Sequence, residues 1–287
     1  MAARLKSDPE TTWHFALVGL KTDVEQFDLW HSLAFLQKVE DAPGEIELAG
    51  ALSQPHLFGA LGRYSAAMTY EIRVTPDMDD ELAFSFAWSM VALLRAKTLV
   101  EILVPAAADH SWSAIAGIKD NSCQVVVIED VPFVKRLADA VTVNEADLGW
   151  VAAHLEAFME LRSKPEFQLA AEALSGHQHQ TSDRMMAAML WSGIEAIFGI
   201  NTELRFRLAT MIAALLEPRG AARRSMYRRV KRLYNVRSRI VHGGKASDEE
   251  IAEHIVEVRA LLSGLLCQFV EGRKIPSETD IEKLVFE

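Results

Sequence analysis

Apolar positions recur at two different spacings along the chain, and the change between them falls near residue 143. Before it, segments that alternate at period two or are rich in β-branched residues predict strands at 13–20, 68–74 and 124–128. A longer helical stretch at 79–103 begins with three acidic residues and is followed by Pro105. The segment 27–33 is compatible with strand or helix, and we favour a strand.

From Asn144 onward the strand signals give way to helical periodicity, interrupted by proline and glycine. This pattern predicts helices at 145–162, 165–175, 182–199, 203–217, 222–242 and 248–272. A short strand or helix is expected at 281–286. Short connections favour antiparallel packing of neighbouring helices in a bundle. The sequence thus predicts an α+β fold, with a mixed α/β domain of unknown role at 1–143 and an all-α bundle at 144–287.

The helix expected at 222–242 carries a charge on its apolar side. At about 100° per residue, one stripe contains Val230, Leu233, Tyr234, Ile240 and Val241. Arg237 falls in the middle of this stripe, and His242 precedes the helix-stopping pair Gly243 and Gly244. Because a buried charge is costly unless it is paired or faces an interface or ligand, we expect Arg237 to have a defined partner.

The same region holds a concentration of positive charge in an acidic protein. The formal net charge is −10, yet residues 219–239 include nine Arg or Lys residues and no acid. A solvated helix face is one interpretation of this run. The other is a phosphate-binding surface, which we favour because the rest of the chain would repel a polyanion. The candidate RNA-binding residues on this surface are Arg228, Lys231, Arg232 and Arg239.

Three segments in order resemble one known family. Arg237-x4-His242, set in Leu-Tyr-x-x-Arg-Ser-x-Ile-Val-His-Gly, resembles the Arg-x(4–6)-His signature of HEPN domains, and more closely the Apea-like HEPN branch. Upstream, residues 188–198 and 203–209 resemble the preceding helices of that branch at similar spacing. The resemblance covers the C-terminal half of the chain and nothing before it.

This resemblance implies a metal-independent endoribonuclease without a cofactor that acts as a homodimer. His242 would be the general acid/base, Arg237 would hold the scissile phosphate, and the RNA 2′-hydroxyl would be the nucleophile. Glu195 and Ser238 would support the site; many HEPN nucleases have Asn, Asp or His where Ser238 stands. Positions 237 and 242 are about 140° apart on a helix, so a dimer through this helix would let both copies contribute. The resemblance also suggests a toxin or anti-phage defence effector with an antitoxin or defence-system partner protein.

A structural role for both motif residues stays open as an alternative. In this interpretation Arg237 pairs with an internal acid such as Glu195, and His242 caps the helix C-terminus, where positive charge is favoured by the helix dipole. In that case a non-catalytic HEPN module for dimerisation, RNA binding or protein binding is the competing function.

Other chemistry is sparse. The two cysteines, Cys123 and Cys267, have no metal or redox spacing, which together with the lack of an N-terminal apolar signal segment favours a reducing cytoplasm. The longest apolar run is too short for a bilayer, so no membrane partner is expected. The pair His177 and His179 is interpreted as an exposed loop, and no metal site is predicted. No nucleotide-binding loop or nucleophile triad is recognisable.

Overall fold

The chain has the α+β fold that the sequence predicts. The computed structural model describes residues 11–129, 141–199, 204–241 and 243–286. Within these residues two compact units can be distinguished: unit 1 contains residues 11–94, 100–129 and 141–153, and unit 2 contains residues 95–99, 154–199, 204–241 and 243–286. The boundary predicted at residue 143 precedes a helix whose first residues, up to Ala153, belong to unit 1. In the described residues, none of the helices has the length and apolarity that crossing a membrane requires.

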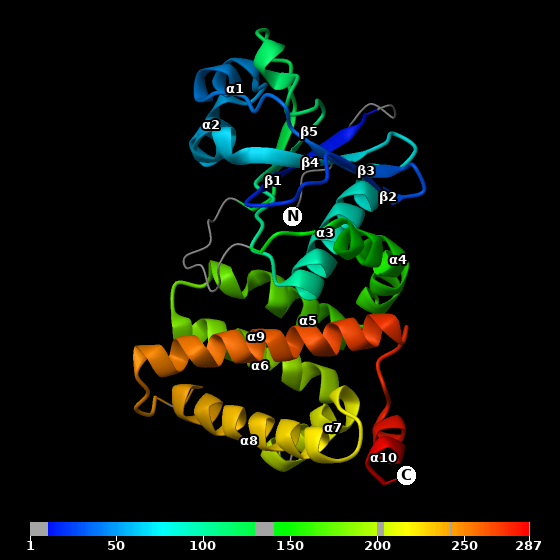
Figure 1. Cartoon of the computed structure of the whole chain (residues 1–287). Coiled ribbons are helices and arrows are strands. Elements are labelled where there is room, and N and C mark those ends of the chain that lie inside the picture. The colour runs from blue at the N-terminus through cyan, green and yellow to red at the C-terminus, as the bar shows by residue number, and fades with distance from the viewer. Residues whose placement is uncertain (1–10, 130–140, 200–203, 242, 287) are drawn as a thin grey trace. The chain divides into compact units, whose positions relative to one another are not determined.

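Unit 1 is built on an antiparallel sheet with the strand order β2-β3-β4-β1-β5-β6 (Figure 1). The strands are β1 (Trp13–Val18), β2 (Gln26–Trp30), β3 (Ala34–Lys38), β4 (Met68–Val74), β5 (Ala106–Ala108) and β6 (Val125–Val127). Short helices connect them: α1 (Glu45–Ala51), η1 (Pro55–Leu57), α2 (Phe58–Leu61), η2 (Gly62–Ala67) and η3 (Ile115–Gly117). The strand favoured at 27–33 is confirmed for residues up to Trp30.

Helix α3 (Asp80–Thr98) packs its aromatic residues on the sheet. Phe84 meets both Trp13 and Phe15 edge to face, with ring centroids 5.3 and 5.0 Å apart. Asp79 accepts the Leu82 amide and so begins the helix. The prediction that this helix extends to residue 103 is wrong. Leu99 has a left-handed φ of 57°, and Leu103 instead forms a bridge with Val18 at the end of β1.

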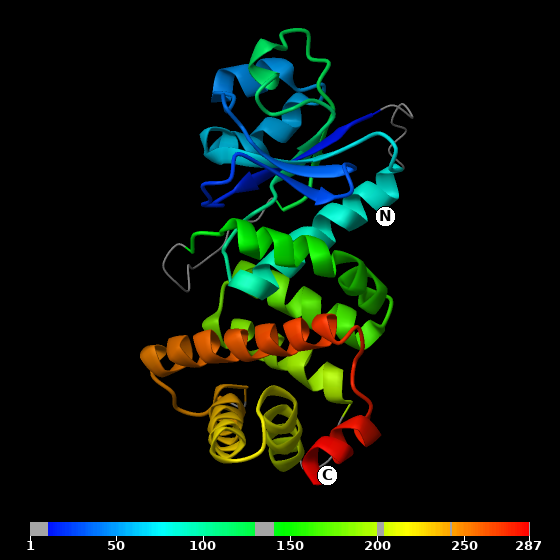
Figure 2. The ribbon, with the colours of Figure 1, turned by 45° about the vertical axis from the view of Figure 1, so that its right-hand side comes forward.

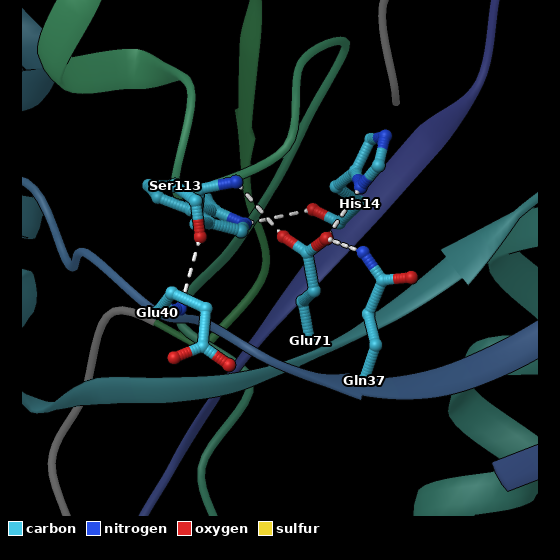
Figure 3. A network of polar contacts seen from close by, with 6 residues as sticks. His14, Gln37, Glu40, Glu71 and Ser113 are labelled. Atoms are coloured by element: carbon cyan, nitrogen blue, oxygen red, sulfur yellow. Dashed lines mark hydrogen bonds and ion pairs between the residues drawn. The ribbon is translucent and has the colours of Figure 1, made fainter. Parts of the chain in front are cut away.

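A buried carboxylate ties several parts of unit 1 together (Figure 3). Glu71 of β4 is 1% exposed. One of its oxygens contacts the His14 ring at 2.8 Å and accepts the Gln37 amide at 2.6 Å, and the other accepts the Trp112 backbone N–H at 2.8 Å. Since the donors come from β1, β3 and the segment after β5, the polar cost of burying Glu71 is met by hydrogen bonds that also fix the register.

Unit 2 is a helical bundle. Its helices are the second half of α4 (Glu145–Arg162), α5 (Pro165–Gly176), η4 (His177–His179), α6 (Asp183–Phe198), α7 (Leu204–Leu216), α8 (Ala221–Val241), α9 (Asp248–Glu271) and α10 (Glu278–Phe286). Their bounds agree with the predicted helices to within a residue or two, and α10 settles the predicted strand or helix at 281–286 as a helix.

Helix α6 packs between α5 and α9, and α8 packs against α6, α7 and α9. Figure 2 shows α7 and α8 lying side by side below α9. Close packing of α5 on α6 depends on Gly193, where an added Cβ would lie 2.8 Å from the Cβ of Ala173. The bundle thereby brings the C-terminal half of α8, which carries the motif arginine, against α6 and α9.

Candidate functional site

The apolar stripe of α8 is narrower than the sequence predicts. Val230, Leu233 and Ile240 are buried, as expected. Tyr234 is only partly buried, and Val241 is 39% exposed. The inclusion of Val241 in the buried stripe is therefore wrong; α8 ends at this residue, and Ile240 is the last buried position of the helix.

Arg237 is partly buried and paired with Glu195 of α6. The Arg237 Nη2 atom lies 3.0 Å from Glu195 Oε1 and donates to Oε2 at 3.1 Å. The exposed fractions of the two side chains are 18% and 23%. Burial raises the pKa of the Glu195 carboxyl above its usual value, and the neighbouring guanidinium offsets part of that effect. This pairing is the internal contact that the sequence left open as an alternative.

One donor of Arg237 is unused. Its Nε–H is buried and has no hydrogen-bond acceptor in the part of the chain that the structure describes. The carbon of the guanidinium also lies 5.6 Å from the centre of the Tyr234 ring, within the range of a cation–π contact. The guanidinium is thus fixed by a carboxylate and an aromatic ring while it keeps an unsatisfied N–H, which has a physical cost unless water or a ligand accepts it.

An aromatic and imidazole cluster lies beneath this pair, and sequence reasoning missed it. The Tyr234 ring meets Trp191 of α6 edge to face at 5.5 Å. The Trp191 Nε1–H donates to Nε2 of His254, on α9, at 2.9 Å. Because an indole N–H can only donate, His254 must accept and is neutral. Burial lowers the pKa of His254 to about 4. Nothing local in the sequence marks His254 or its partner, because the contact joins α6 to α9.

A second arginine holds the C-terminal end of α8. Gly243 has a φ of 74°, and the Gly244 N–H donates to the Arg239 carbonyl at 2.7 Å, which closes the helix as a Schellman motif does. Arg184, at the start of α6, donates to the carbonyls of Ile240 at 2.8 Å and Gly244 at 3.4 Å. A cation at this position complements the helix dipole. Arg184 was not among the predicted site residues.

The two remaining residues of the predicted site are Ser238 and His242. Ser238 is partly buried, one position after Arg237. His242, the predicted general acid/base, lies outside the described residues. The structure thus brings Arg237, Glu195 and Tyr234 together next to a helix end that Arg184 caps.

The predicted RNA-binding cations differ in how far they are neutralised. Arg228 is exposed and has no ion-pair partner among the described residues. Lys231 lies 5.4 Å from the centre of the Tyr227 ring. Arg232 donates to Glu257 of α9 at 2.9 Å, and Arg239 is paired with Glu250. The acids of α9 therefore cancel part of the positive charge that the local sequence of α8 suggests.

The same carboxylate engages a further cation of α8. Arg229 donates to Glu257 at 2.8 Å, so this residue bridges two arginines. The two arginines and the hydrogen bonds they donate lower the pKa of Glu257, outweighing the effect of its burial. A cavity of about 280 Å³ lies at the other end of α8 against Arg223, Arg224 and Tyr227, so it is not part of the motif site.

The interpretation of His177 and His179 as an exposed loop pair is wrong, since both residues belong to η4 and His179 is partly buried. His177 departs furthest from it. This residue is fully buried in η4, where its Nδ1 atom contacts the Leu174 carbonyl at 2.8 Å. Burial lowers the pKa of His177 to about 3, which keeps the ring neutral. The group of metal-ligating side chains that the described residues do bring together lies elsewhere, in unit 1, and consists of Asp109, His110 and Cys123.

Comparison with known proteins adds no relative. No family model matches the chain, and neither the curated proteins nor the solved structures contain a significant match. The residues and contacts described above are therefore the basis for a functional proposal.

Proposed function

We propose that this protein is a metal-independent endoribonuclease of the HEPN type. The observation that carries the proposal is the state of Arg237, which is held at the bundle surface by Glu195 and Tyr234 with one N–H donor unused. A planar guanidinium fixed in this way can bind phosphate oxygens as negative charge builds on them. The resemblance of the Arg237-x4-His242 segment to the HEPN signature supplies the reaction class.

In the proposed reaction the RNA 2′-oxygen attacks the adjacent phosphorus and the bond to the 5′-oxygen breaks. His242 takes the proton from the 2′-hydroxyl and returns a proton to the leaving 5′-oxygen, since imidazole titrates near neutral pH. Arg237 stabilises the charge on the phosphate. The products are a 2′,3′-cyclic phosphate and a free 5′-hydroxyl, and neither a metal nor a cofactor takes part.

Glu195 and Ser238 have supporting roles in this proposal. Glu195 sets the position of the guanidinium, and a bound phosphate would share Arg237 with it. Because burial already raises the pKa of Glu195, an arriving phosphodiester anion would favour protonation of this carboxyl further. Arg228 and Lys231 would contact the RNA backbone away from Arg237, and Arg232 and Arg239 would do so only in competition with the acids of α9.

We further propose that the site is composite, with α8 at a two-fold interface. Positions 237 and 242 of a regular helix would be about 140° apart, so an isologous dimer would let Arg237 of one copy face His242 of the other. An RNA-cutting dimer of this kind fits a toxin or anti-phage effector in the cytoplasm that a partner protein, such as an antitoxin, restrains.

A second function is favoured by a specific observation. Arg237 is already paired with Glu195, and Arg229, Arg232 and Arg239 are paired with acids of α9. Cations used internally in this way suit a non-catalytic HEPN module that dimerises or binds RNA or a protein partner. Such a module would keep the fold and the pairing of Arg237 but would not cleave RNA.

The first experiment measures cleavage of total RNA by the purified full-length protein in EDTA. We expect fragments with 2′,3′-cyclic phosphate ends from the wild type and a loss of at least about 100-fold in His242→Ala and Arg237→Ala. His56→Ala and Arg273→Ala, both at exposed positions outside the site, serve as matched controls and should cleave normally. RNA that stays intact with every protein, or is cut equally by His242→Ala, would reject the enzyme in favour of the binding module.

The composite site has its own test. Two inactive variants, Arg237→Ala and His242→Ala, are mixed and allowed to exchange subunits. If Arg237 and His242 of opposite copies form each site, half of the sites in the mixed dimer are intact, and cleavage returns to a fraction of the wild-type rate. A mixture that stays inactive, although light scattering shows a dimer, would place both residues of each site in one copy.

A further inference from the structure

Three side chains with metal-binding chemistry meet at one end of the sheet in unit 1. Asp109 and His110 directly follow β5, and Cys123 lies two residues before β6. One potential ligand atom from each residue lies within 4.8 Å of the other two. The Asp109 carboxylate also contacts the His110 ring at 2.7 Å. Thirteen positions of sequence separate His110 from Cys123, so the sequence spacing alone does not reveal this cluster.

The backbone fixes the positions of two of the three residues. The Asp109 N–H donates to the Gln124 carbonyl at 3.1 Å, and the Gln124 N–H donates to the Asp109 carboxylate at 3.0 Å. On its other side, the Cys123 N–H donates to the Ala51 carbonyl at 3.0 Å, and the Cys123 carbonyl accepts the Ser53 N–H at 2.9 Å. Cys123 is wholly buried. Ligands held on a rigid frame bind a metal at a lower entropic cost than ligands on a mobile loop.

We propose that Asp109, His110 and Cys123 form a binding site for a zinc-class divalent cation, with water as the fourth ligand. A thiolate sulfur with an imidazole nitrogen favours a borderline-soft ion such as Zn²⁺ over Mg²⁺ or Ca²⁺, which prefer oxygen ligands only. Three protein ligands leave one position of a tetrahedron open.

A modest rearrangement of side chains would bring the three groups to bonding distance, because the Asp109–His110 contact of 2.7 Å must lengthen and the widest separation, up to 4.8 Å, must shorten. Bonds of about 2.0 Å to nitrogen and oxygen and about 2.3 Å to sulfur require the ligand atoms to be roughly 3.5 Å apart. The His110 side chain is 43% exposed, so its ring can change orientation with little loss of packing. Binding would replace the contact between Asp109 and His110 by two bonds to the same ion.

Binding of the cation exchanges one proton of the Cys123 thiol for the metal ion. A cysteine thiol carries its proton at neutral pH when no cation is bound. Binding therefore forms the metal–sulfur bond and releases the thiol proton to solvent. Since a proton is released, affinity should rise with pH over the neutral range.

The experiment uses the full-length protein, stripped with a chelator under reducing conditions and titrated with Co²⁺ as a spectroscopic substitute for Zn²⁺. We expect one equivalent of Co²⁺ to produce a thiolate-to-cobalt charge-transfer band and tetrahedral visible bands, both abolished by added Zn²⁺. The charge-transfer band should be absent from Cys123→Ser and present in Cys267→Ser, which removes the other thiol. His110→Ala should bind Co²⁺ at least about tenfold more weakly, and His56→Ala should bind like the wild type.

His110→Ala decides the question if Cys123→Ser does not fold, because His110 lies at the surface and its removal leaves the core intact. The proposal fails if the stripped wild type shows no charge-transfer band. It also fails if the band persists in Cys123→Ser, disappears in Cys267→Ser, or is unaffected by His110→Ala. In any of these cases the contact between Asp109 and His110 is only a local ion pair that closes the loop after β5.

Discussion

At the scale of single residues, the structure gives Arg237 the defined partner that its place in an apolar stripe implied. The chemistry of a buried guanidinium was enough to predict that a partner exists. Glu195 could be named from the sequence only as one of two options, because the contact joins residues on separate helices. Trp191, His254 and Arg184 could not be found in that way, since each is unremarkable on its own helix and gains its role from a distant neighbour.

The Arg237 and Glu195 pair should contribute measurably to stability. In a double-mutant cycle of Arg237→Ala and Glu195→Gln, we expect a coupling energy of about 1–2 kcal/mol in urea unfolding. The reason is that each single change leaves a partly buried polar group without its partner. The exposed pair of Arg273 and Glu160 provides the comparison cycle, and its coupling energy should be clearly smaller because solvent screens the charges. Equal coupling in the two cycles would show that burial adds nothing at Arg237.

At the scale of elements, the sequence predicted the helices of unit 2 well because proline and glycine end them. Unit 1 was harder. The turn between β2 and β3 contains His31 and Ser32 with φ values of 45° and 64°, although neither is glycine. The Asp28 carboxylate accepts the Trp30 and Ser32 amides and holds that turn. The prediction of helix at residues 99–103 was wrong for a related reason. Leu99 ends α3 in a left-handed conformation, which a leucine in the sequence does not indicate.

The contact between α5 and α6 gives a prediction for a matched pair of glycines in unit 2. Gly193→Ala should destabilise the protein by about 1–3 kcal/mol, because the new methyl group would overlap Ala173. In Gly264→Ala the nearest atom is 3.9 Å from the new methyl group, so better helix propensity should stabilise the protein by up to about 1 kcal/mol. Thermal unfolding of both variants measures the difference, and a stable Gly193→Ala would contradict the close packing of these helices.

The ion pairs between α8 and α9 predict a gain of RNA binding. Glu257→Gln should release Arg229 and Arg232 towards solvent, so the protein should bind single-stranded RNA several-fold more tightly at low salt. Each additional phosphate contact steepens the dependence of log K on log salt by about 0.7. Glu253→Gln changes the charge of the same helix at an exposed position and is the control. If the two variants have identical affinity and slope, the α8 cations do not meet RNA.

At the scale of the whole molecule, charge is arranged differently in space than along the chain. The basic run at 219–239 suggested a free cationic surface, but acids of α9, more than ten positions further on, neutralise three of its arginines. Sequence reasoning could see the excess of like charge and not its compensation, because the compensating contacts arise only when α8 and α9 pack together. The buried histidines are a second effect of packing, and they make the stability of the protein depend on pH.

The stability of the protein should fall as pH falls below about 6.5. The pKa values of His254 and His177 are lowered from 6.5 to about 4 and about 3. Between those values and 6.5, the unfolded chain therefore binds protons that the folded chain does not bind. Their contribution is complete above pH 6.5 and is lost as pH falls through the folded-state values. For His254 this contribution to the free energy of unfolding is about 3 kcal/mol. Glu195, whose pKa is raised, acts in the opposite sense, because its contribution is lost as pH rises through its folded-state value.

Urea unfolding at pH 7.5, 6 and 5 tests this expectation. In His254→Gln the amide oxygen can still accept the Trp191 N–H but does not titrate, so the free energy of unfolding should vary less with pH than in the wild type. His56→Gln, at an exposed position, should leave the wild-type dependence unchanged. A pH dependence in His254→Gln as steep as that of the wild type would mean that this ring is not neutral in the folded protein.

The carboxylate of Glu71 also bears on how the sheet assembles. Its donors stand on two neighbouring strands and on a third segment, and side chains alternate between faces along a strand. A slip of β1 or β3 by one residue would turn His14 or Gln37 to the other face and leave the buried Glu71 carboxyl without a hydrogen-bond partner. Mispaired sheets would thus carry a penalty that the native pairing escapes. Glu71 thereby favours correct strand pairing when the sheet assembles.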